Sequence, residues 1–206
     1  MAYEIELIKK NQLKTNNWSG GTTTQLAIHP KDAIYSERNF KWRLSSAKVD
    51  VDESDFTSLP GIDRIIMIIE GQLKLEHEGH HKSVLNPFDQ DSFSGSWKTK
   101  SYGRVIDFNL MTSEDCDGSL EAIHLLKGKT KKITFDKEID KFLKETQAIY
   151  CVDGQTRVDI ANNESFRLNK GDIILITSEH NFNHRDFKVH NDGDTQSKLI
   201  KATIRY

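Results

Sequence analysis

The chain has 206 residues, with 29 lysines and arginines against 31 aspartates and glutamates, and its formal net charge is −2. Charges of the two signs are mixed along the chain rather than gathered into blocks, so the sequence lacks the basic face or tail that marks a nucleic-acid-binding protein. The longest aliphatic run, residues 65–69, is far shorter than the roughly 20 apolar residues of a membrane-spanning helix. We therefore expect neither a nucleic-acid partner nor a membrane partner.

The compartment is suggested by the amino terminus and by the cysteines. The first ten residues alternate polar and apolar side chains and contain no apolar core of a secretory signal. Cys116 and Cys151 are the two cysteines, and they form neither a CxxC motif nor a disulfide framework. We expect a cytoplasmic protein.

Strand signals dominate the chain. Nine short segments are rich in β-branched and aromatic residues and are bounded by turn residues. They cover residues 22–28, 40–49, 64–70, 72–76, 105–111, 148–152, 156–160, 173–177 and 197–204. One helix is predicted over residues 137–145, where apolar side chains recur with helical spacing behind Asp136. The pattern predicts an all-β sandwich or barrel.

An internal repeat divides the chain into two halves. Residues 63–76 align with residues 146–159, so that Gly71 corresponds to Gly154, and in both copies an apolar strand is followed by an acidic residue and a Gly-Gln turn. We interpret this as a hairpin. Each copy continues into a second turn and a further strand, and this layout resembles the cupin half-motif. The repeat predicts a bicupin, with two tandem jelly-roll halves at 1–115 and 116–206. Because no linker separates them, we expect one compact unit.

Cupins that bind a metal place a His-x-His and a Glu before the glycine turn and a third His after the second turn. Residues 55–63 and 140–145 occupy the first of these positions and contain no histidine. His180 and His184 follow the second turn of the later half but have no upstream partners. We expect no bound metal and no cofactor.

Three further histidines, His77, His80 and His81, lie in a Glu-His-Glu-Gly-His-His segment between two strands. We expect a solvated hairpin tip that titrates near neutral pH, binds metal adventitiously and does not catalyse a reaction.

The sequence predicts no nucleophilic catalyst. It has no Gly-x-Ser-x-Gly elbow. Acidic neighbours are expected to raise the pKa of Cys116, and Cys151 lies in an apolar strand that is typical of a core.

Two strands carry polar residues on a single face. In residues 40–47, alternation places Arg43 and Ser45 opposite the apolar side chains, and in residues 105–111 it does the same for Asp107 and Asn109. Two interpretations stay open. The polar faces are either solvated, with Arg43 and Asp107 paired, or they line the mouth of a barrel.

A family resemblance rests on motifs in a fixed order over almost the whole chain. These motifs are Trp18-Ser-Gly-Gly-Thr, Phe40-Lys-Trp-Arg-Leu-Ser-Ser-Ala, residues 55–64, Gly71, Phe93-Ser-Gly and Asp107-Phe-Asn. The chain thereby resembles the HutD/Ves family. The resemblance implies a bicupin without the usual metal ligands, for which no catalytic activity is established. Some relatives lie among histidine-utilisation genes, and others are described as stress-induced.

The resemblance also implies a set of ligand-binding residues. They are Trp18, Gly20, Gly21, Arg43, Ser45, Arg64, Asp107 and Asn109. Ser19 stands where the family usually has Asn, Thr22 stands where it has a further Gly or polar residue, and the second half is more divergent. The implied role of the histidine-pathway members is to bind a small carboxylate, such as a formylated or formimino glutamate, and so to moderate flux.

Three hypotheses follow. The first is a metal-free bicupin that binds a small anionic metabolite without changing it, since a guanidinium donates paired hydrogen bonds to a carboxylate. The second is a metal-independent isomerase, for which His29 and His180 are the candidate bases. The third is a stress-related protein with a vestigial pocket. The sequence leaves the ligand and the oligomeric state open, a dimer included.

Overall fold

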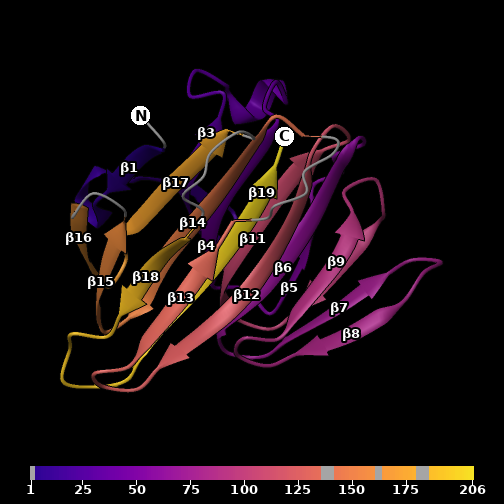
Figure 1. Ribbon diagram of the computed structural model, residues 1–206. Coiled ribbons are helices and arrows are strands. Elements are labelled where there is room, and N and C mark those ends of the chain that lie inside the picture. Colours follow the sequence, from indigo (N-terminus) through magenta and orange to yellow (C-terminus); the bar gives the residue numbers. More distant parts are fainter. Residues whose placement is uncertain (1–2, 136–141, 161–163, 180–185) are drawn as a thin grey trace. The chain divides into compact units, whose positions relative to one another are not determined.

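The computed structural model describes residues 3–135, 142–160, 164–179 and 186–206. These residues form nineteen strands and two short 3-10 helices, η1 (Lys10–Gln12) and η2 (Tyr35–Glu37), as Figure 1 shows. The predicted all-β class is therefore confirmed. The chain divides into two compact units, an N-terminal unit of Leu13–Asp117 and a C-terminal unit of Met1–Gln12 with Gly118–Tyr206.

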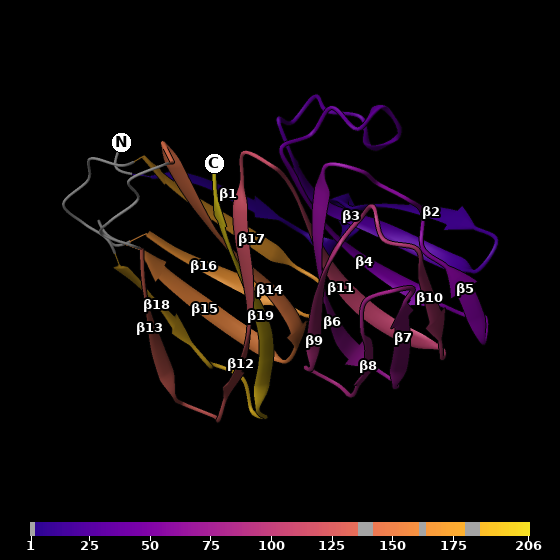
Figure 2. The same cartoon turned by 90° about the vertical axis from the view of Figure 1, so that its right-hand side faces the viewer.

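The N-terminal unit consists of two antiparallel sheets, which form two layers in Figure 2. The six-stranded sheet has the order β2-β3-β4-β11-β6-β9. Its strands are β2 (Lys14–Trp18), β3 (Gly21–His29), β4 (Trp42–Val49), β6 (Ile62–Glu70), β9 (Gln90–Ser94) and β11 (Val105–Ser113). The four-stranded sheet has the order β5-β10-β7-β8. Its strands are β5 (Glu53–Asp55), β7 (Leu73–His77), β8 (Lys82–Leu85) and β10 (Thr99–Tyr102).

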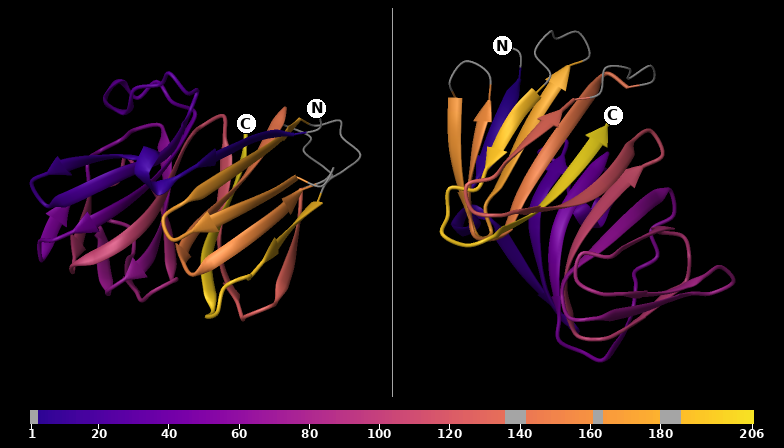
Figure 3. Two further views of the ribbon diagram at one scale, coloured as in Figure 1. Left: turned by 90° about the vertical axis from the view of Figure 1, so that its left-hand side faces the viewer. Right: turned by 60° about the horizontal axis from the view of Figure 1, so that its bottom comes forward.

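The C-terminal unit repeats this two-sheet arrangement, seen in the orange and yellow strands of Figure 3. The five-stranded sheet has the order β1-β17-β14-β19-β12. Its strands are β1 (Glu4–Ile8), β12 (Asp117–Leu125), β14 (Lys144–Asp153), β17 (Ile173–Glu179) and β19 (Ser197–Arg205). The other sheet has the order β13-β18-β15-β16. Its strands are β13 (Thr130–Thr134), β15 (Gln155–Ile160), β16 (Glu164–Asn169) and β18 (Asp186–His190).

Each unit has its own hydrophobic core, built from side chains that alternate inward along both of its sheets. In the N-terminal unit the buried side chains of Ile66 and Ile68 on β6 pack with those of Leu73 and Leu75 on β7. In the C-terminal unit Ile149 and Cys151 on β14 pack with Val158 on β15.

The repeat occupies equivalent places in the two units, but its turns are not hairpins. Gly71 joins β6 to β7 and Gly154 joins β14 to β15, with φ angles of 86° and 87°. In each unit the two joined strands belong to different sheets. The hairpin interpretation was wrong because alternation and a glycine turn do not distinguish two paired strands from two strands that face each other across a sandwich.

The predicted helix over residues 137–145 falls mostly on residues 136–141, which lie outside the described residues. Its last two residues, Lys144 and Glu145, belong to β14. Glu145 is fully buried, and its carboxylate accepts a hydrogen bond from Arg205 Nε at 3.2 Å, so cross-strand pairing overrides the helical spacing there.

Candidate functional site

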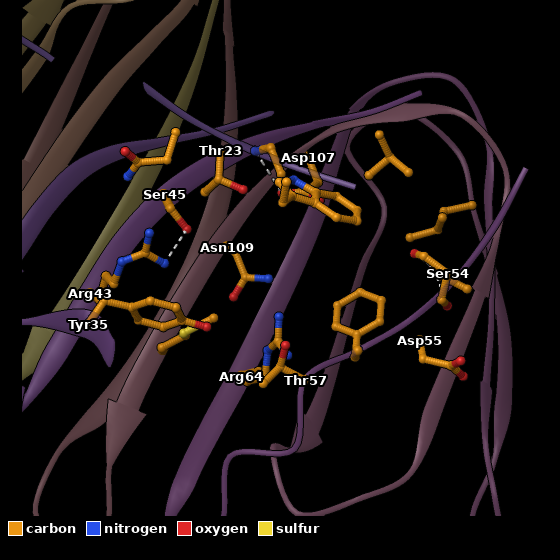
Figure 4. A pocket seen from close by; sticks show the side chains of 18 of the residues that line it. Thr23, Tyr35, Arg43, Ser45, Ser54, Asp55, Thr57, Arg64, Asp107 and Asn109 are labelled. Carbon is orange, nitrogen blue, oxygen red and sulfur yellow. Dashed lines mark hydrogen bonds between the residues drawn. The ribbon is translucent and has the colours of Figure 1, made fainter. Parts of the chain in front are cut away.

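A cavity of about 340 Å³ lies within the N-terminal unit. Its volume is at the lower end of the range for small-molecule sites. Six of the eight residues that the family resemblance selected line it. They are Trp18, Arg43, Ser45, Arg64, Asp107 and Asn109, of which Figure 4 labels all but Trp18.

Strands β4 and β11 bring the polar residues together as alternation predicted. The two strands are antiparallel neighbours, with Asn109 opposite Ser45 and Asp107 opposite Ala47. Their apolar side chains, such as those of Leu44 and Phe108, point to the other face and are fully buried. The polar face therefore lines a cavity.

Arg43 is fixed in place by neutral partners. Its Nε donates to Gln25 Oε1 at 3.0 Å, its NH1 group donates to Ser45 Oγ at 3.1 Å, and its guanidinium lies 4.3 Å from the centre of the Tyr35 ring. Burial lowers the pKa of Arg43, and Tyr35 opposes that effect. The group remains a cation at neutral pH because an unperturbed arginine has a pKa above 12.

Arg64 on β6 is buried, and no described residue accepts a hydrogen bond from its Nε. Its guanidinium lies over the Phe56 ring at 4.5 Å and the Phe93 ring at 5.3 Å. Burial lowers its pKa to about 10, while Tyr35 and Asp107 raise it and Arg43 lowers it further. A buried guanidinium without a hydrogen-bonded anion costs free energy unless a ligand supplies one.

Asp107 and Asn109 complete the polar face. Burial raises the pKa of Asp107 to about 7, against the opposing effects of the Ala47 backbone N–H and of Arg64. That N–H donates to Asp107 Oδ1 at 3.2 Å. The Oδ1 atom of Asn109 is buried without a hydrogen-bond donor.

The solvated interpretation, in which Arg43 and Asp107 pair, does not hold. Asp107 is only 5 % exposed. Among the described residues, Arg43 is bonded to Gln25 and Ser45, and Asp107 is bonded to the Ala47 backbone. The sequence did not indicate that Arg64, on a different strand, is the arginine whose charge acts on Asp107.

The two glycines of the selected set are not among the lining residues. A Cβ on Gly20 would lie 2.1 Å from the Trp18 ring, and one on Gly21 would lie 2.0 Å from the Lys48 carbonyl oxygen. Their small size therefore allows the turn after β2 to close, with Trp18 at the cavity. Direct contact of these glycines with a ligand stays a prediction.

The residues considered for catalysis lie elsewhere. His29 stacks on Trp42, with ring centres 5.6 Å apart, and does not line the cavity. His180 and His184 lie outside the described residues. Burial raises the pKa of both thiols, that of Cys151 to about 12, and Cys151 belongs to the core.

Sequence reasoning missed several contributors to the cavity. Tyr35 precedes β4 in η2, Phe56 follows β5, and Thr23 and Gln25 lie on β3. Alternation along β3 would have placed Thr23 and Gln25 on one face, whereas no local pattern indicates that Tyr35 and Phe56 cover the two guanidinium groups.

The donor set of the cavity suits an anion better than a metal ion. None of the described lining residues is a histidine or cysteine, and the charged ones are two arginines and two aspartates, Asp55 and Asp107. Burial raises the pKa of Asp107 to about 7, which weakens it as a metal ligand. Position 64, which follows the segment where metal-binding cupins carry their ligands, is a guanidinium that cannot coordinate a metal.

The predicted solvated histidine tip is only partly correct. His80 and His81 are exposed at the β7–β8 turn, but His77 is 3 % exposed. Alternation from Leu73 and Leu75 already places His77 on the inward face of β7.

A model of the HutD family matches residues 10–196. The chain belongs to the HutD family. HutD from Pseudomonas fluorescens SBW25, solved in a formate condition, is 22% identical with a TM-score of 0.67, and the match covers 98% of this chain and all of that one.

Other solved structures share the fold at lower identity. A conserved protein of unknown function from Pseudomonas aeruginosa PAO1, PA5104, has a TM-score of 0.80 at 18% identity, over 98% of this chain and all of that one. YhhW from Escherichia coli has a TM-score of 0.69 at 11% identity, over 97% of each chain. These similarities confirm the cupin fold of this HutD-family chain. In the described residues, no helix is long and apolar enough to cross a membrane.

Proposed function

We propose that this HutD-family protein binds a small carboxylate in the cavity of its N-terminal unit and moderates flux through a pathway of which that carboxylate is an intermediate. The resemblance to histidine-utilisation proteins makes formyl-glutamate and formimino-glutamate the first candidates. The protein acts by binding, and the ligand leaves unchanged.

The observation that carries the proposal is the buried guanidinium of Arg64. It faces a cavity, lies against two aromatic rings and has an Nε without an acceptor among the described residues. A carboxylate would supply both the missing acceptor and a full negative charge in direct contact with the guanidinium. A bidentate arginine–carboxylate pair is stronger in a semi-enclosed site than at the surface.

The remaining polar groups suit the rest of such a ligand. Arg43 is a second cation in the same cavity, and the Asn109 Oδ1 atom lacks a donor. An N-acylated glutamate has two carboxylates and an N–H donor, which match two guanidinium groups and an amide oxygen.

One observation favours a second candidate, a metal-independent isomerase. Burial raises the pKa of Asp107 to about 7, and a carboxyl group that titrates near the working pH can act as a general acid or base. The two candidates differ in whether the ligand is recovered unchanged after incubation, which mass spectrometry of the ligand measures.

The test is a thermal-shift titration with formate, N-formyl-glutamate, N-formimino-glutamate, urocanate and small keto acids. A ligand that binds only the native state at a hundredfold excess over Kd should stabilise it by about 2.7 kcal/mol. Arg64→Met should abolish this stabilisation. Arg104→Met is the control, because Arg104 is exposed in the same unit and pairs with Asp52.

The Arg64→Met variant should remain folded without ligand, since methionine fills part of the space beside the two aromatic rings and the buried guanidinium without an acceptor on Nε is removed. In denaturant titrations we expect its unfolding free energy to be no lower than that of the unmutated protein, and at most about 3 kcal/mol higher. A lower unfolding free energy in the variant would mean that Arg64 stabilises the folded protein instead of serving as a binding residue. If no compound stabilises the unmutated protein, carboxylate binding is contradicted.

A further inference from the structure

Two histidines and an aspartate converge at one edge of the N-terminal unit, away from the cavity. His77 is the last residue of β7, His81 precedes β8, and Asp91 lies on β9. His77 Nε2 lies 3.2 Å from Asp91 Oδ2, and His81 Nε2 lies 3.1 Å from the same oxygen. One donor atom from each residue falls within 4.8 Å of the other two.

The hydrogen bonds behind His77 indicate its tautomer. The Thr99 hydroxyl donates to the Trp97 carbonyl at 3.4 Å, so its oxygen is free to accept a proton from His77 Nδ1 at 2.8 Å. The lone pair of His77 is then on Nε2 and points at the Asp91 carboxylate. Two acceptors that face each other need a proton or a metal ion between them. Histidines that bind metals are likewise oriented by an acceptor that takes the proton of the other ring nitrogen.

Asp91 is likewise held in place by hydrogen bonds, and no described lysine or arginine forms an ion pair with it. Its carboxylate accepts hydrogen bonds from the Ser83 hydroxyl and from the backbone N–H of Ser92. In the described chain its ion-pair partners are the two histidines, whereas Asp159 of the C-terminal unit pairs with Arg157 as well as with His190.

We propose that His77 Nε2, His81 Nε2 and the Asp91 carboxylate bind one divalent transition-metal ion of the zinc type. In a tetrahedral zinc site with bonds of about 2.0–2.1 Å, neighbouring ligand atoms lie about 3.3 Å apart. The two distances to Asp91 Oδ2, 3.2 and 3.1 Å, are within a few tenths of an ångström of that value. Water completes the site on its open side, because the His81 side chain is 42% exposed while that of His77 is fully buried.

The position of this site suggests a structural role. Asp91 belongs to β9 at the edge of the six-stranded sheet, and His77 and His81 belong to the segment that leads into β8 at the edge of the four-stranded sheet. A metal bound there links the two layers of the sandwich where both sheets end. None of the three ligands lines the carboxylate cavity, so the two proposals are independent.

The chain offers a matched control at the same turn. His80 is exposed and stacks on Trp97, with ring centres 3.7 Å apart, and it is not one of the converging residues. A turn that collects metal only because it is rich in histidine would depend on His80 as much as on His81.

The experiment uses the full chain stripped with a chelator and titrated with Zn²⁺ by calorimetry and with Co²⁺ by visible absorption. We expect one equivalent of either ion, a tetrahedral Co²⁺ spectrum, and a higher melting temperature with metal. Asp91→Asn and His81→Asn should each weaken binding by at least about tenfold, and His80→Asn should not.

Three results would overturn the proposal. They are the absence of a saturable one-to-one complex, an octahedral Co²⁺ spectrum that matches the ion in buffer, and an equal loss of affinity in His80→Asn and His81→Asn. Asp91 and His81 are changed rather than His77 because their side chains are partly exposed, so the variants are expected to fold, which circular dichroism checks.

Discussion

Asp107 is the residue of the cavity whose charge changes near neutral pH. Burial raises its pKa to about 7 from an ordinary value of 3.8, and the charged groups that line the same cavity are Arg43, Arg64 and Asp55. Between pH 4 and 7 the folded chain therefore holds a proton that the unfolded chain has released. Because the folded state binds more protons in this window, the unfolding free energy falls as the pH rises towards 7 and then levels off.

Replacing Asp107 by asparagine should remove this dependence. Asparagine keeps the hydrogen bond from the Ala47 N–H but cannot ionise, so the variant should be more stable than the unmutated protein at pH 8 by up to about 4 kcal/mol and similar to it at pH 4. Urea unfolding at both pH values measures the difference. A constant difference across the range would show that ionisation of Asp107 is not its cause.

At this scale the sequence predicted the polar residues but not their partners. Alternation on two strands was sufficient to place Arg43, Ser45, Asp107 and Asn109 on one face, because side-chain direction in a strand is a local property. Pairing is not local. The ring that covers Arg43 comes from η2, and those that cover Arg64 come from the segment after β5 and from β9.

At the scale of elements, two turns of the N-terminal unit require glycine for different reasons. Gly71 lies in the turn that joins β6 to β7 in the other sheet, and Gly79 lies in the turn between β7 and β8 of one sheet. Gly71 has a φ of 86°, and a Cβ added there would lie 2.5 Å from the Arg104 carbonyl oxygen. Gly79 has a φ of 77° with no atom within 4 Å of the added Cβ. An alanine at Gly79 would therefore cause backbone strain alone, whereas an alanine at Gly71 would cause backbone strain and steric overlap.

Gly79→Ala should cost about 1 kcal/mol, the strain of a left-handed alanine. Gly71→Ala should cost about 2–4 kcal/mol, because the methyl group must also displace backbone. Denaturant unfolding of the two variants gives the comparison. An equal loss of unfolding free energy in the two variants would mean that the backbone of the turn after β6 moves to accommodate the methyl group without cost.

All nine strands predicted from the sequence are present, extended or trimmed by a few residues at their ends. The strands that were missed are mostly short and polar, such as β2, in which every residue is exposed, and β5, which has three residues. Strands of this kind are held by hydrogen bonds to a neighbour rather than by burial of one face. Hydrophobic alternation cannot reveal them.

At the scale of the whole molecule, the path of the chain departs from a simple division at residue 115. Strand β1 pairs with β17, with Glu4 opposite Thr177 and Ile8 opposite Ile173, so the first residues complete the five-stranded sheet of the C-terminal unit. The end of this segment is anchored by Asp172, which accepts hydrogen bonds from Lys9 Nζ at 2.9 Å and from the Lys10 backbone N–H at 2.9 Å.

This path predicts that the first nine residues stabilise the unit that is remote from them in sequence. Deleting residues 1–9 would expose the edge of β17, from Ile173 to Thr177, and remove the Lys9 side chain from Asp172. Amide hydrogen exchange should become faster in β17 and stay unchanged in β4, because β4 belongs to the N-terminal unit.

The control is Lys9→Met, which removes the ion pair but keeps strand β1. It should leave exchange in β17 close to that of the unmutated protein, since a half-exposed ion pair contributes at most about 1 kcal/mol, whereas an entire edge strand protects the amides of its neighbour. If the deletion instead accelerates exchange in β4 and leaves β17 protected, the assignment of the first residues to the C-terminal unit is wrong.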